Sequence, residues 1–469
     1  MNINRRKFLK RTGAGLVLSS LLPAYSFAQT GGKAEEKPKY PTLKFDVAVV
    51  GAGPAGIPAA IAAARNGAKV VLIEEDLAPG GAPVDMYVTF MCGGPRMGLF
   101  KKLVQTLNQR FSVGGISSET FGETGSDGKN HWWMPASFQQ VYQEMIMAEP
   151  NITLMCGVPV VDAIVAENGN RNQVKGVRIL RNGGFQHIEA AITIDASGNG
   201  IVAATAGCKI LYGSEAKSDF NESFGLDVSD GKVQPVTQMY ISQRVRKDAV
   251  FPIDKFGSGV LEDNQLQWAQ EQPREEFYAR NTGVFLQWGA SVYCPDTTDP
   301  VQIAEAQQKV MNNQKKNIQV IQEAGFAVHL APKIGVRESR RVQGEAVITV
   351  DDLFQGVKPD DTIAHAHYAI DAWGWNIPYE VKTSVKPYGI PYRALIPLNT
   401  EGLLTAGRII SGTRLANSSY RVQPVCSNIG EAAGTAAAIA AFNQTTVRNI
   451  DVGELQKNLD SYGLFDAYK

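Results

Sequence analysis

KFDVAVVGAGPAGIPAAIAAARNGAKVVLIEED, residues 44–76, carries the strongest fold signal in the chain. Phe45–Val50 is a short apolar run rich in β-branched residues, which predicts a strand buried on both faces. The alanine-rich residues 55–66 predict a helix, and Val70–Ile73 predicts a second buried strand that ends in Glu74. The order of strand, glycine turn, helix, strand and acid is the fingerprint of a dinucleotide-binding fold.

Each glycine of the turn has a physical role in this interpretation. Gly51 permits the sharp turn, Gly53 lets the backbone approach a pyrophosphate, and Gly56 lets the helix pack closely on the sheet. The helix N-terminus then faces the phosphates with unpaired N–H groups and the positive end of its dipole. Glu74 is placed to accept hydrogen bonds from ribose hydroxyls. The motif by itself suits NAD and FAD equally.

Length, charge and cysteine content exclude several classes of protein. A chain of 469 residues can form two or three domains with substantial cores. Lys plus Arg equals Asp plus Glu, at 46 each, so no global field favours nucleic acid or an anionic membrane as a partner. The five cysteines are isolated, without a C-x-x-C motif, so we expect no metal site. One disulfide bridge remains possible.

The N-terminus has the features of an export signal. Residues 4–10, NRRKFLK, closely resemble a twin-arginine signal. The apolar stretch Gly13–Leu22 is too short to span a bilayer, and small residues before Ala28 predict cleavage after that residue. We therefore expect residues 1–28 to be a signal peptide, residues 29–44 to be a flexible lead, and the mature protein to be periplasmic or otherwise exported. No stable membrane span is expected after cleavage.

The export signal bears on the choice of cofactor. Twin-arginine export carries folded proteins, often with a cofactor already inserted. A freely exchanging nicotinamide would be lost outside the cytoplasm, whereas a tightly held flavin would be retained. The signal therefore favours FAD over NAD as the ligand of the glycine turn.

A β-meander is expected in the middle of the FAD-binding region. Val158–Val165, Gln173–Leu180 and Phe185–Ala190 alternate polar and apolar residues and are separated by Asn/Gly turns. Ala191–Ile194 is predicted to form a further apolar strand. It leads into a second glycine-containing turn, Asp195–Gly200, which again presents backbone N–H groups to a cofactor.

Five motifs together resemble the successive FAD motifs of the glutathione-reductase-like flavoproteins: Gly51–Gly56, Glu74, Asp195–Gly198, Leu404–Arg408 and Ile429–Gly434. Three further segments resemble the narrower family of FAD-dependent oxidoreductases related to the flavin subunit of heterodisulfide reductase: Arg337–Arg341, Ile390–Arg393 and Arg421–Pro424. The similarity covers roughly residues 45–445. The chain lacks clustered iron–sulfur cysteines, so an electron route through such clusters is not expected.

The resemblance implies a fold and a division of the chain. The fold class is α/β, with a Rossmann-like FAD-binding domain of the glutathione-reductase type, a β-meander and an inserted α+β substrate domain. Residues 45–210 and 398–445 would form the discontinuous FAD-binding domain. Residues 211–397 would form the inserted substrate (cap) domain, and residues 446–469 a C-terminal tail. In the last helix, Asn428 and Glu431 fit a capping box.

The resemblance also implies which residues contact FAD: Gly51, Gly53, Pro54, Ala55, Gly56, Glu74, Glu75, Gly81, Val160, Ala196, Ser197, Gly198, Gly407, Arg408 and Gly430. The glycine turn would hold the pyrophosphate and Glu74 the adenosine ribose. The backbone of Val160 would meet the adenine. The helix that begins near Gly430 would direct its N-terminus at the N1/O2 edge of the flavin, where reduction places negative charge.

Candidate catalytic residues come from the family-like segments. His367 is expected to transfer a proton, Tyr392 to orient the substrate, and Arg421 and Arg341 to hold an anion. His365 and His367 would share a face of one strand. Six arginines recur in these segments and favour an anionic substrate if they converge, or structural ion pairs if they do not: Arg337, Arg340, Arg341, Arg393, Arg414 and Arg421. Trp373 and Trp375 suit either a stacking platform or the core.

These observations predict an exported FAD-dependent oxidoreductase. It would oxidise or reduce a small organic substrate by hydride transfer to or from flavin N5 and exchange electrons with an acceptor that the sequence does not identify. Two alternatives remain open at this point. One is an NAD(P)-dependent dehydrogenase, and the other is a flavin-containing electron-transfer partner without a small substrate of its own.

Overall fold

A central sheet of parallel strands organises the chain in the computed structural model, which describes residues 38–110, 114–117, 129–252 and 283–465. The predicted signal peptide, residues 1–28, and residues 29–37 of the lead lie outside the described residues. The division into an FAD-binding domain and an inserted substrate domain stays a prediction.

The parallel part of the sheet has the strand order β19-β8-β1-β2-β5. The bounds of these strands are Leu43–Val50 (β1), Val70–Ile73 (β2), Ile152–Met155 (β5), Gly184–Asp195 (β8) and Leu403–Thr405 (β19). The end of β1 and the whole of β2 are buried, as the continuous apolar runs predict. The α/β fold class is thereby confirmed, and the strands end together at one edge of the sheet.

The meander joins this sheet through one long strand. β6 (Val160–Asn168) pairs antiparallel with β7 (Arg171–Arg181), and β7 pairs antiparallel with the first half of β8. The separate strand expected at Ala191–Ile194 is the second half of β8, so that prediction is wrong. No turn-forming residue interrupts β8 at this point, and its far half pairs with β1 and β19. β18 (Thr400–Glu401) pairs with β7.

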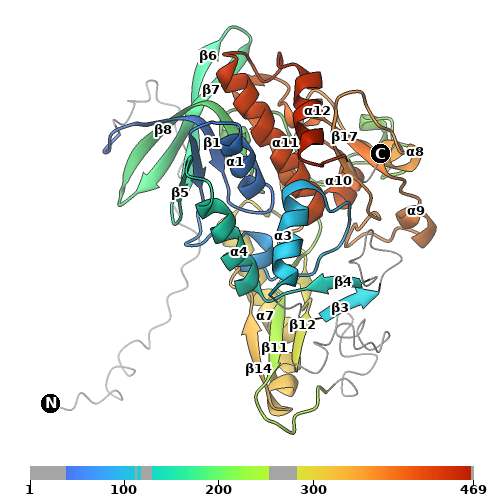
Figure 1. Ribbon diagram of the computed structural model, residues 1–469. Coiled ribbons are helices and arrows are strands. Elements are labelled where there is room, and N and C mark those ends of the chain that lie inside the picture. Colours follow the sequence, from blue (N-terminus) through green and yellow to red (C-terminus); the bar gives the residue numbers. More distant parts are fainter. Residues whose placement is uncertain (1–37, 111–113, 118–128, 253–282, 466–469) are drawn as a thin grey trace, which may run out of the picture. The chain divides into compact units, whose positions relative to one another are not determined.

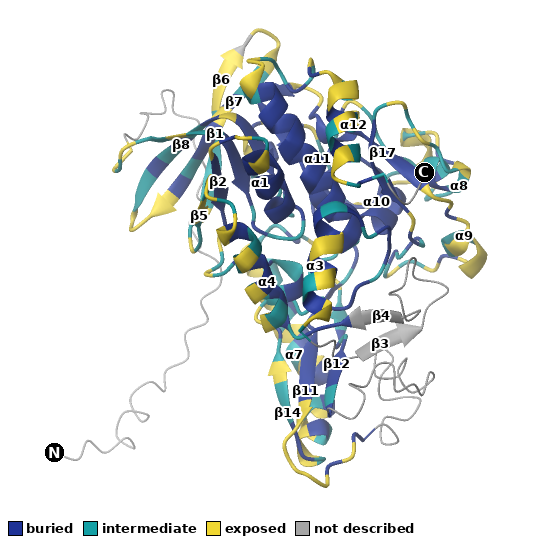
Figure 2. Cartoon of the chain, in the orientation of Figure 1, coloured by how far each residue is buried: buried dark blue, intermediate teal, exposed yellow. Residues whose placement is uncertain are grey.

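Two helices lie side by side over one face of the sheet, α1 (Gly56–Arg65) and α11 (Gln423–Phe442) (Figure 1). Small residues allow the contact, because a Cβ atom on Gly430 or Gly434 would lie 2.0 Å from a carbonyl oxygen of α1 or of the turn before it. Figure 2 shows that α11 is buried along most of its length. By length and composition α11 could cross a membrane, but 89% of its apolar window is buried inside the protein, as in a core helix.

α11 begins earlier than the sequence predicted. Its first residue is Gln423, and Pro424 occupies the first turn, where proline is well tolerated. Asn428 therefore lies inside the helix, and the predicted capping box with Glu431 is wrong. Instead, Oε2 of Glu431 accepts a hydrogen bond of 2.8 Å from the backbone N–H of Leu99, near the start of α3 (Gly98–Asn108).

Smaller elements surround the sheet. A three-stranded antiparallel sheet, β12-β11-β14, packs with helix α7. These elements lie on the side of the fold away from the meander (Figure 1). Their bounds are Tyr240–Arg244 (β11), Val284–Gln287 (β12), Pro300–Glu323 (α7) and Phe326–Leu330 (β14). The other helices are α2 (Ala82–Asp85), α4 (Pro135–Met147), α5 (Ile201–Thr205), α8 (Val350–Gln355), α9 (Tyr379–Thr383), α10 (Arg414–Tyr420) and α12 (Val452–Ser461). The other strands are β3 (Gly114–Ser117), β4 (Lys129–Trp132), β9 (Ile210–Leu211), β10 (Val236–Thr237), β13 (Ser291–Val292), β15 (Arg341–Val342), β16 (Thr362–Ala366) and β17 (Tyr388–Pro391). The cysteines, all within the described residues, are free thiols.

Candidate functional site

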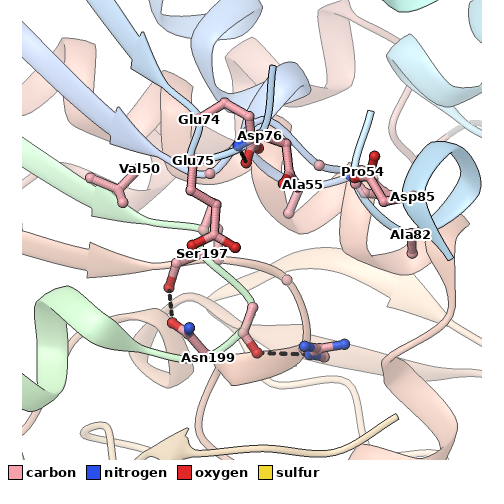
Figure 3. A pocket seen from close by; sticks show the side chains of 18 of the residues that line it. Val50, Pro54, Ala55, Glu74, Glu75, Asp76, Ala82, Asp85, Ser197 and Asn199 are labelled. Carbon is pink, nitrogen blue, oxygen red and sulfur yellow. Dashed lines mark hydrogen bonds between the residues drawn. The ribbon is translucent and has the colours of Figure 1, made fainter. Parts of the chain in front are cut away.

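A cavity of about 310 Å³ opens where β1, β2 and β8 end. Ligands of open α/β sheets bind at this carboxyl edge of the strands. The turn after β1, the acids after β2 and the turn after β8 all line it, and Figure 3 shows their side chains around the cavity. We call it the first cavity.

The glycine turn leaves room for a ligand at one of its three glycines. Gly51 has φ +97°, and a Cβ there would lie 2.5 Å from the carbonyl oxygen of Ala196, so the turn itself requires glycine. A Cβ on Gly53 would meet only the Cα of Gly81, at 3.8 Å. The space beside Gly53 therefore belongs to the cavity, and a pyrophosphate fits there. No side chain caps the N-terminus of α1, so the positive end of the helix dipole is left for phosphate oxygens.

Glu74 is fixed by the backbone around it. Its carboxylate accepts hydrogen bonds from the N–H groups of Ala52, at 2.6 Å, and Asp76, at 3.1 Å. The side chain is buried, and burial raises the pKa of this carboxyl above its usual value. Lys333 closes the same end of the cavity through ion pairs with Glu75, at 2.9 Å, and Asp76, at 2.6 Å. The carboxylate of Glu74 keeps acceptor capacity for a ribose hydroxyl.

The turn after β8 is held in shape by Asp195. Its Oδ1 accepts from the backbone N–H and the hydroxyl of Ser197, at 3.1 and 2.6 Å, and its Oδ2 accepts from the N–H of Ala203 at 2.9 Å. Burial raises the pKa of Asp195. Ser197 also contacts Asn199 at 3.0 Å (Figure 3), and the carbonyl of Gly198 accepts from Nε of Arg408 at 2.7 Å. This turn therefore forms a rigid second wall of the cavity.

A second cavity of about 390 Å³ adjoins the first. Both cavities are lined by Ala82, Met86, Arg408, Arg421 and Gln423. Gln423 is the first residue of α11, and no side chain caps this helix, so its N-terminus lies at the junction. The remaining walls are mainly apolar or aromatic: Val88, Phe90, Met239, Trp288, Val336, Tyr368, Trp373 and Val422.

Four charged side chains among the described residues line the second cavity: Arg337, Asp371, Arg408 and Arg421. Nη2 of Arg421 donates to the backbone oxygen and to Oδ2 of Asp371, each at 2.9 Å. Arg337 lies over the ring of Trp373, 4.2 Å from its centroid, and donates through Nη1 to Thr237 at 2.5 Å. Burial, together with the positive charge of Arg421, lowers the pKa of Arg337 to about 10. Burial also lowers the pKa of Arg408 to about 10.

The structure brings most of the predicted cofactor residues together. Thirteen of the fifteen line the first cavity: Gly51, Gly53, Pro54, Ala55, Glu74, Glu75, Gly81, Val160, Ala196, Ser197, Gly198, Gly407 and Arg408. Gly56 and Gly430 do not. A Cβ on Gly56 would lie 1.7 Å from the carbonyl oxygen of Gly51, and one on Gly430 would lie 2.0 Å from that of Ala55. Both glycines therefore serve close packing, and Gln423 rather than Gly430 marks the helix start at the cavity.

The four predicted catalytic residues are not brought together. Arg421 lines both cavities, but Tyr392 is buried elsewhere and donates its hydroxyl proton to the carbonyl of Val447 at 2.8 Å. Arg341 is buried in ion pairs with Glu338 and with Glu215. Neither Tyr392 nor Arg341 lines either cavity.

The two histidines lie in different environments. β16 ends at Ala366, so His365 belongs to the strand and His367 follows it. His365 is buried against Phe465, and burial lowers its pKa to about 4. His367 is exposed and lines neither cavity, while its backbone N–H contacts the carbonyl of Gly94 at 3.4 Å. The expected shared face is not formed.

The six arginines separate into two groups. Arg337 and Arg421 line the second cavity, whereas the other four are held by structural contacts. Arg340 donates to the carbonyl of Asn199 and the hydroxyl of Thr298. Arg341 forms ion pairs with Glu338 and Glu215, and Arg414 also pairs with Glu338. Arg393 pairs with Asp361. The sequence could not separate them, because all six occupy similar motif-like segments.

Two site residues have no clear sequence signal. Asp371 lies in an irregular segment before Trp373, and Lys333 lies in a loop after β14. Each reaches its cavity only through long-range packing. No group of three or more His, Cys, Asp or Glu side chains suited to a metal ion occurs in the part of the chain that the structure describes.

The parallel sheet, the glycine turn and the first cavity define a dinucleotide-binding α/β protein. The family model described as FAD dependent oxidoreductase matches residues 46–459, and the chain belongs to this family. It is therefore an FAD-dependent oxidoreductase, and FAD is the cofactor that the first cavity fits. The family decides the choice that the glycine motif had left open between NAD and FAD.

Other comparisons are more distant. The tRNA uridine 5-carboxymethylaminomethyl modification enzyme MnmG of Pediococcus pentosaceus is 25% identical over an alignment of 259 residues that covers 51% of this chain and 36% of that enzyme. The chain thus spans little more than a third of this relative. A geranylgeranyl bacteriochlorophyll reductase-like protein from Thermoplasma acidophilum gives a TM-score of 0.45 at 12% identity, covering 90% of this chain and 83% of that one. A myxobacterial chondrochloren halogenase gives a TM-score of 0.43 at 15% sequence identity, covering 90% of this chain and 79% of that one.

Proposed function

We propose that this protein is an exported oxidoreductase that acts on a small organic substrate bound in the second cavity. The observation that supports this most directly is the shared wall of the two cavities, formed by five common residues. A substrate in the second cavity would lie next to the reactive end of a cofactor held in the first. A volume of about 390 Å³ suits one small molecule.

Bound FAD supplies a hydride acceptor or donor at N5 of its ring. The glycine turn and the N-terminus of α1 would hold the pyrophosphate, and Glu74 and Val160 would hold the adenosine end. Arg421 and the positive end of the uncapped α11 dipole would stabilise negative charge that develops at the junction of the cavities.

Asp371 is the proton-transfer group in this proposal. Of the described residues that line the second cavity, it is the only carboxylate, and none is a histidine. Its Oδ2 accepts from Arg421, which orients the carboxylate and leaves Oδ1 for a substrate proton. His367, the group expected from the sequence, lies outside both cavities, so the geometry favours Asp371.

The site of action is proposed from the N-terminal sequence. Residues 4–10 have the pattern of a twin-arginine signal, and a tightly held cofactor suits export of the folded protein. We propose a periplasmic or otherwise exported enzyme that has no nucleic-acid partner and no stable membrane span after cleavage. Its electron acceptor is a separate molecule. A relationship to the glutathione-reductase-like flavoproteins is proposed on the five sequence motifs.

Anaerobic mixing tests this function. The purified FAD-loaded protein is mixed with a panel of sugars, polyols, amines and hydroxy acids, and bleaching of the visible flavin band is followed. Chemically reduced protein is mixed in parallel with unsaturated and carbonyl compounds, and return of the band is followed. We expect one panel to contain a substrate. If only a protein partner changes the flavin's redox state, the chain is an electron-transfer partner instead.

A further inference from the structure

The charge of the second cavity is not balanced by the protein. Three arginines line it, Arg337, Arg408 and Arg421, and among its described lining residues only Asp371 opposes them. Both Arg408 and Arg421 also line the first cavity, so FAD can use their charge. Arg337 lines the second cavity alone, and the cofactor's cavity does not account for it.

The guanidinium groups of Arg337 and Arg421 have N–H donors that make no hydrogen bond within the described part of the protein. The hydrogen bonds of Arg337 to the carbonyl of Pro235 and the hydroxyl of Thr237 both come from Nη1. Neither of these acceptors is charged. Nε of Arg421 is buried without a hydrogen-bond partner, because the contacts of Arg421 with Asp371 come from Nη2. Buried donors of this kind favour an acceptor that arrives with a ligand.

Arg337 is also held in place. Its guanidinium stacks on Trp373, and the following residue, Glu338, is locked in ion pairs with Arg341 and Arg414. A fixed planar guanidinium favours a planar anion, because two parallel N–H groups match the two oxygens of a carboxylate. Burial, and then repulsion from Arg421, lowers the pKa of Arg337, and an anion bound beside its guanidinium would stabilise the charged form.

The rest of the cavity is apolar. Phe90 and Trp288 contact each other edge to face, 5.8 Å between centroids, and Met86 and Met239 complete this wall. Such side chains bind a hydrocarbon or aromatic body rather than a strongly hydrated one.

We propose that the substrate is a small carboxylate with an apolar or aromatic body, and that Arg337 binds its carboxylate. This inference deepens the proposed function and rests on it for naming the occupant as the substrate. The apolar wall holds the body, and the stacked guanidinium of Arg337 fixes the end of the molecule away from the reacting carbon.

Binding titrations of the FAD-loaded protein test the inference without turnover. Benzoate, its neutral isostere benzamide and inorganic phosphate are added separately, with flavin absorbance and tryptophan fluorescence as readouts. We expect benzoate to bind at least about 10-fold more tightly than benzamide, the value of one charge-assisted hydrogen bond, and more tightly than phosphate. Equal binding of benzoate and benzamide, or tighter binding of phosphate, would overturn the proposal.

Variants locate the anion site. Arg337→Gln should weaken benzoate binding by about 10- to 100-fold and leave benzamide binding unchanged, with FAD content as in the wild type. Arg337→Lys keeps the charge without the planar fork and should give an intermediate loss. Arg393→Gln is the matched control, because Arg393 pairs with Asp361 at an exposed position outside both cavities. Unchanged benzoate binding in Arg337→Gln, or an equal loss in Arg393→Gln, would overturn the assignment.

The two proposals fail in different ways. Selective binding of benzoate without any small molecule that changes the flavin's redox state would remove the proposed function and keep the anion site. Turnover of neutral substrates, with benzoate and benzamide bound equally, would keep the function and remove the anion site. The contrast between benzoate and benzamide uses the wild-type protein, so it does not depend on a variant that folds.

Discussion

A Cβ atom on Gly56 at the start of α1 would lie 1.7 Å from the carbonyl oxygen of Gly51, the residue after β1. Only glycine therefore fits at the first residue of the helix, which lies against the turn after the strand. Gly53, between them, has no such neighbour and faces the first cavity. The glycines of one motif thus have separable roles, in packing and in ligand binding.

Gly53→Val should abolish FAD retention without destabilising the protein when the cofactor is absent. The added side chain would occupy cavity space that the pyrophosphate needs, and the protein itself leaves that space open. Gly56→Ala should instead lower the free energy of unfolding of the flavin-free protein by about 1–3 kcal/mol, because of overpacking. Flavin content measures the effect of Gly53→Val, and thermal unfolding of the flavin-free forms measures the stability of both variants. A yellow, fully loaded Gly53→Val protein would contradict the assignment.

Glu74→Ala should weaken FAD binding by about 1–3 kcal/mol, the cost of losing an acceptor in a buried site. The N–H of Ala52 would also lose its 2.6 Å bond, which destabilises the flavin-free protein as well. Because the pKa of Glu74 is raised, its carboxylate is neutralised at a higher pH than usual, and FAD affinity should fall as the pH drops through that raised value. Equilibrium titration of flavin-free protein decides this. Unchanged affinity would remove Glu74 from the ribose site.

Asp371→Asn should slow flavin reduction by a substrate about 10²-fold or more, while FAD stays bound. The asparagine keeps the shape and an acceptor for Arg421 but cannot take a proton. Rapid-mixing reduction kinetics measure the rate once the panel has yielded a substrate. His367→Ala is the companion variant, and we expect its rate to stay within a few-fold of the wild type. The opposite pattern would return proton transfer to His367.

Arg5-Arg6→Lys-Lys should leave a folded, flavin-loaded protein in the cytoplasm. The paired arginines act as an address, and residues 4–10 precede the region that the family model matches. Cell fractionation with a flavin assay on each fraction measures the outcome. Export of the double-lysine protein at the normal level would rule out the twin-arginine interpretation.

Glu431→Gln should make the protein less sensitive to alkaline pH. Burial raises the pKa of Glu431 to about 7 from 4.5, so the folded state binds more protons than the unfolded state between these values. Stability of the wild type therefore falls as the pH rises through this window, by roughly 2–4 kcal/mol for this group. Glutamine does not titrate and can still accept from the N–H of Leu99. Denaturant unfolding at pH 5 and pH 8 measures the free energy of unfolding of both proteins. The variant should become more stable relative to the wild type at pH 8 than at pH 5. The same difference in unfolding free energy at both pH values would contradict the raised pKa.

The sequence by itself determined the dinucleotide-binding fold and one wall of the cofactor cavity. These features depend on short-range signals, namely buried β-branched runs, glycines in a turn and an acid at a strand end, all within 44–76. Such residues reach the cavity because neighbouring parallel strands end at the same edge. The turn after β8 follows the same rule, and Ser197 and Gly198 line the first cavity.

Only the tertiary structure decided the composition of the second cavity. Arg337 and Arg341 are four residues apart in one motif, yet Arg337 lines the cavity and Arg341 is buried against Glu338. Asp371 and Arg421 are distant in sequence and meet only because α10 and α11 pack against the segment after β16. Arginine, histidine and tyrosine carry the same chemistry in a core ion pair and in a binding site. Which of the two they form depends on long-range packing, and one sequence contains no local signal for it.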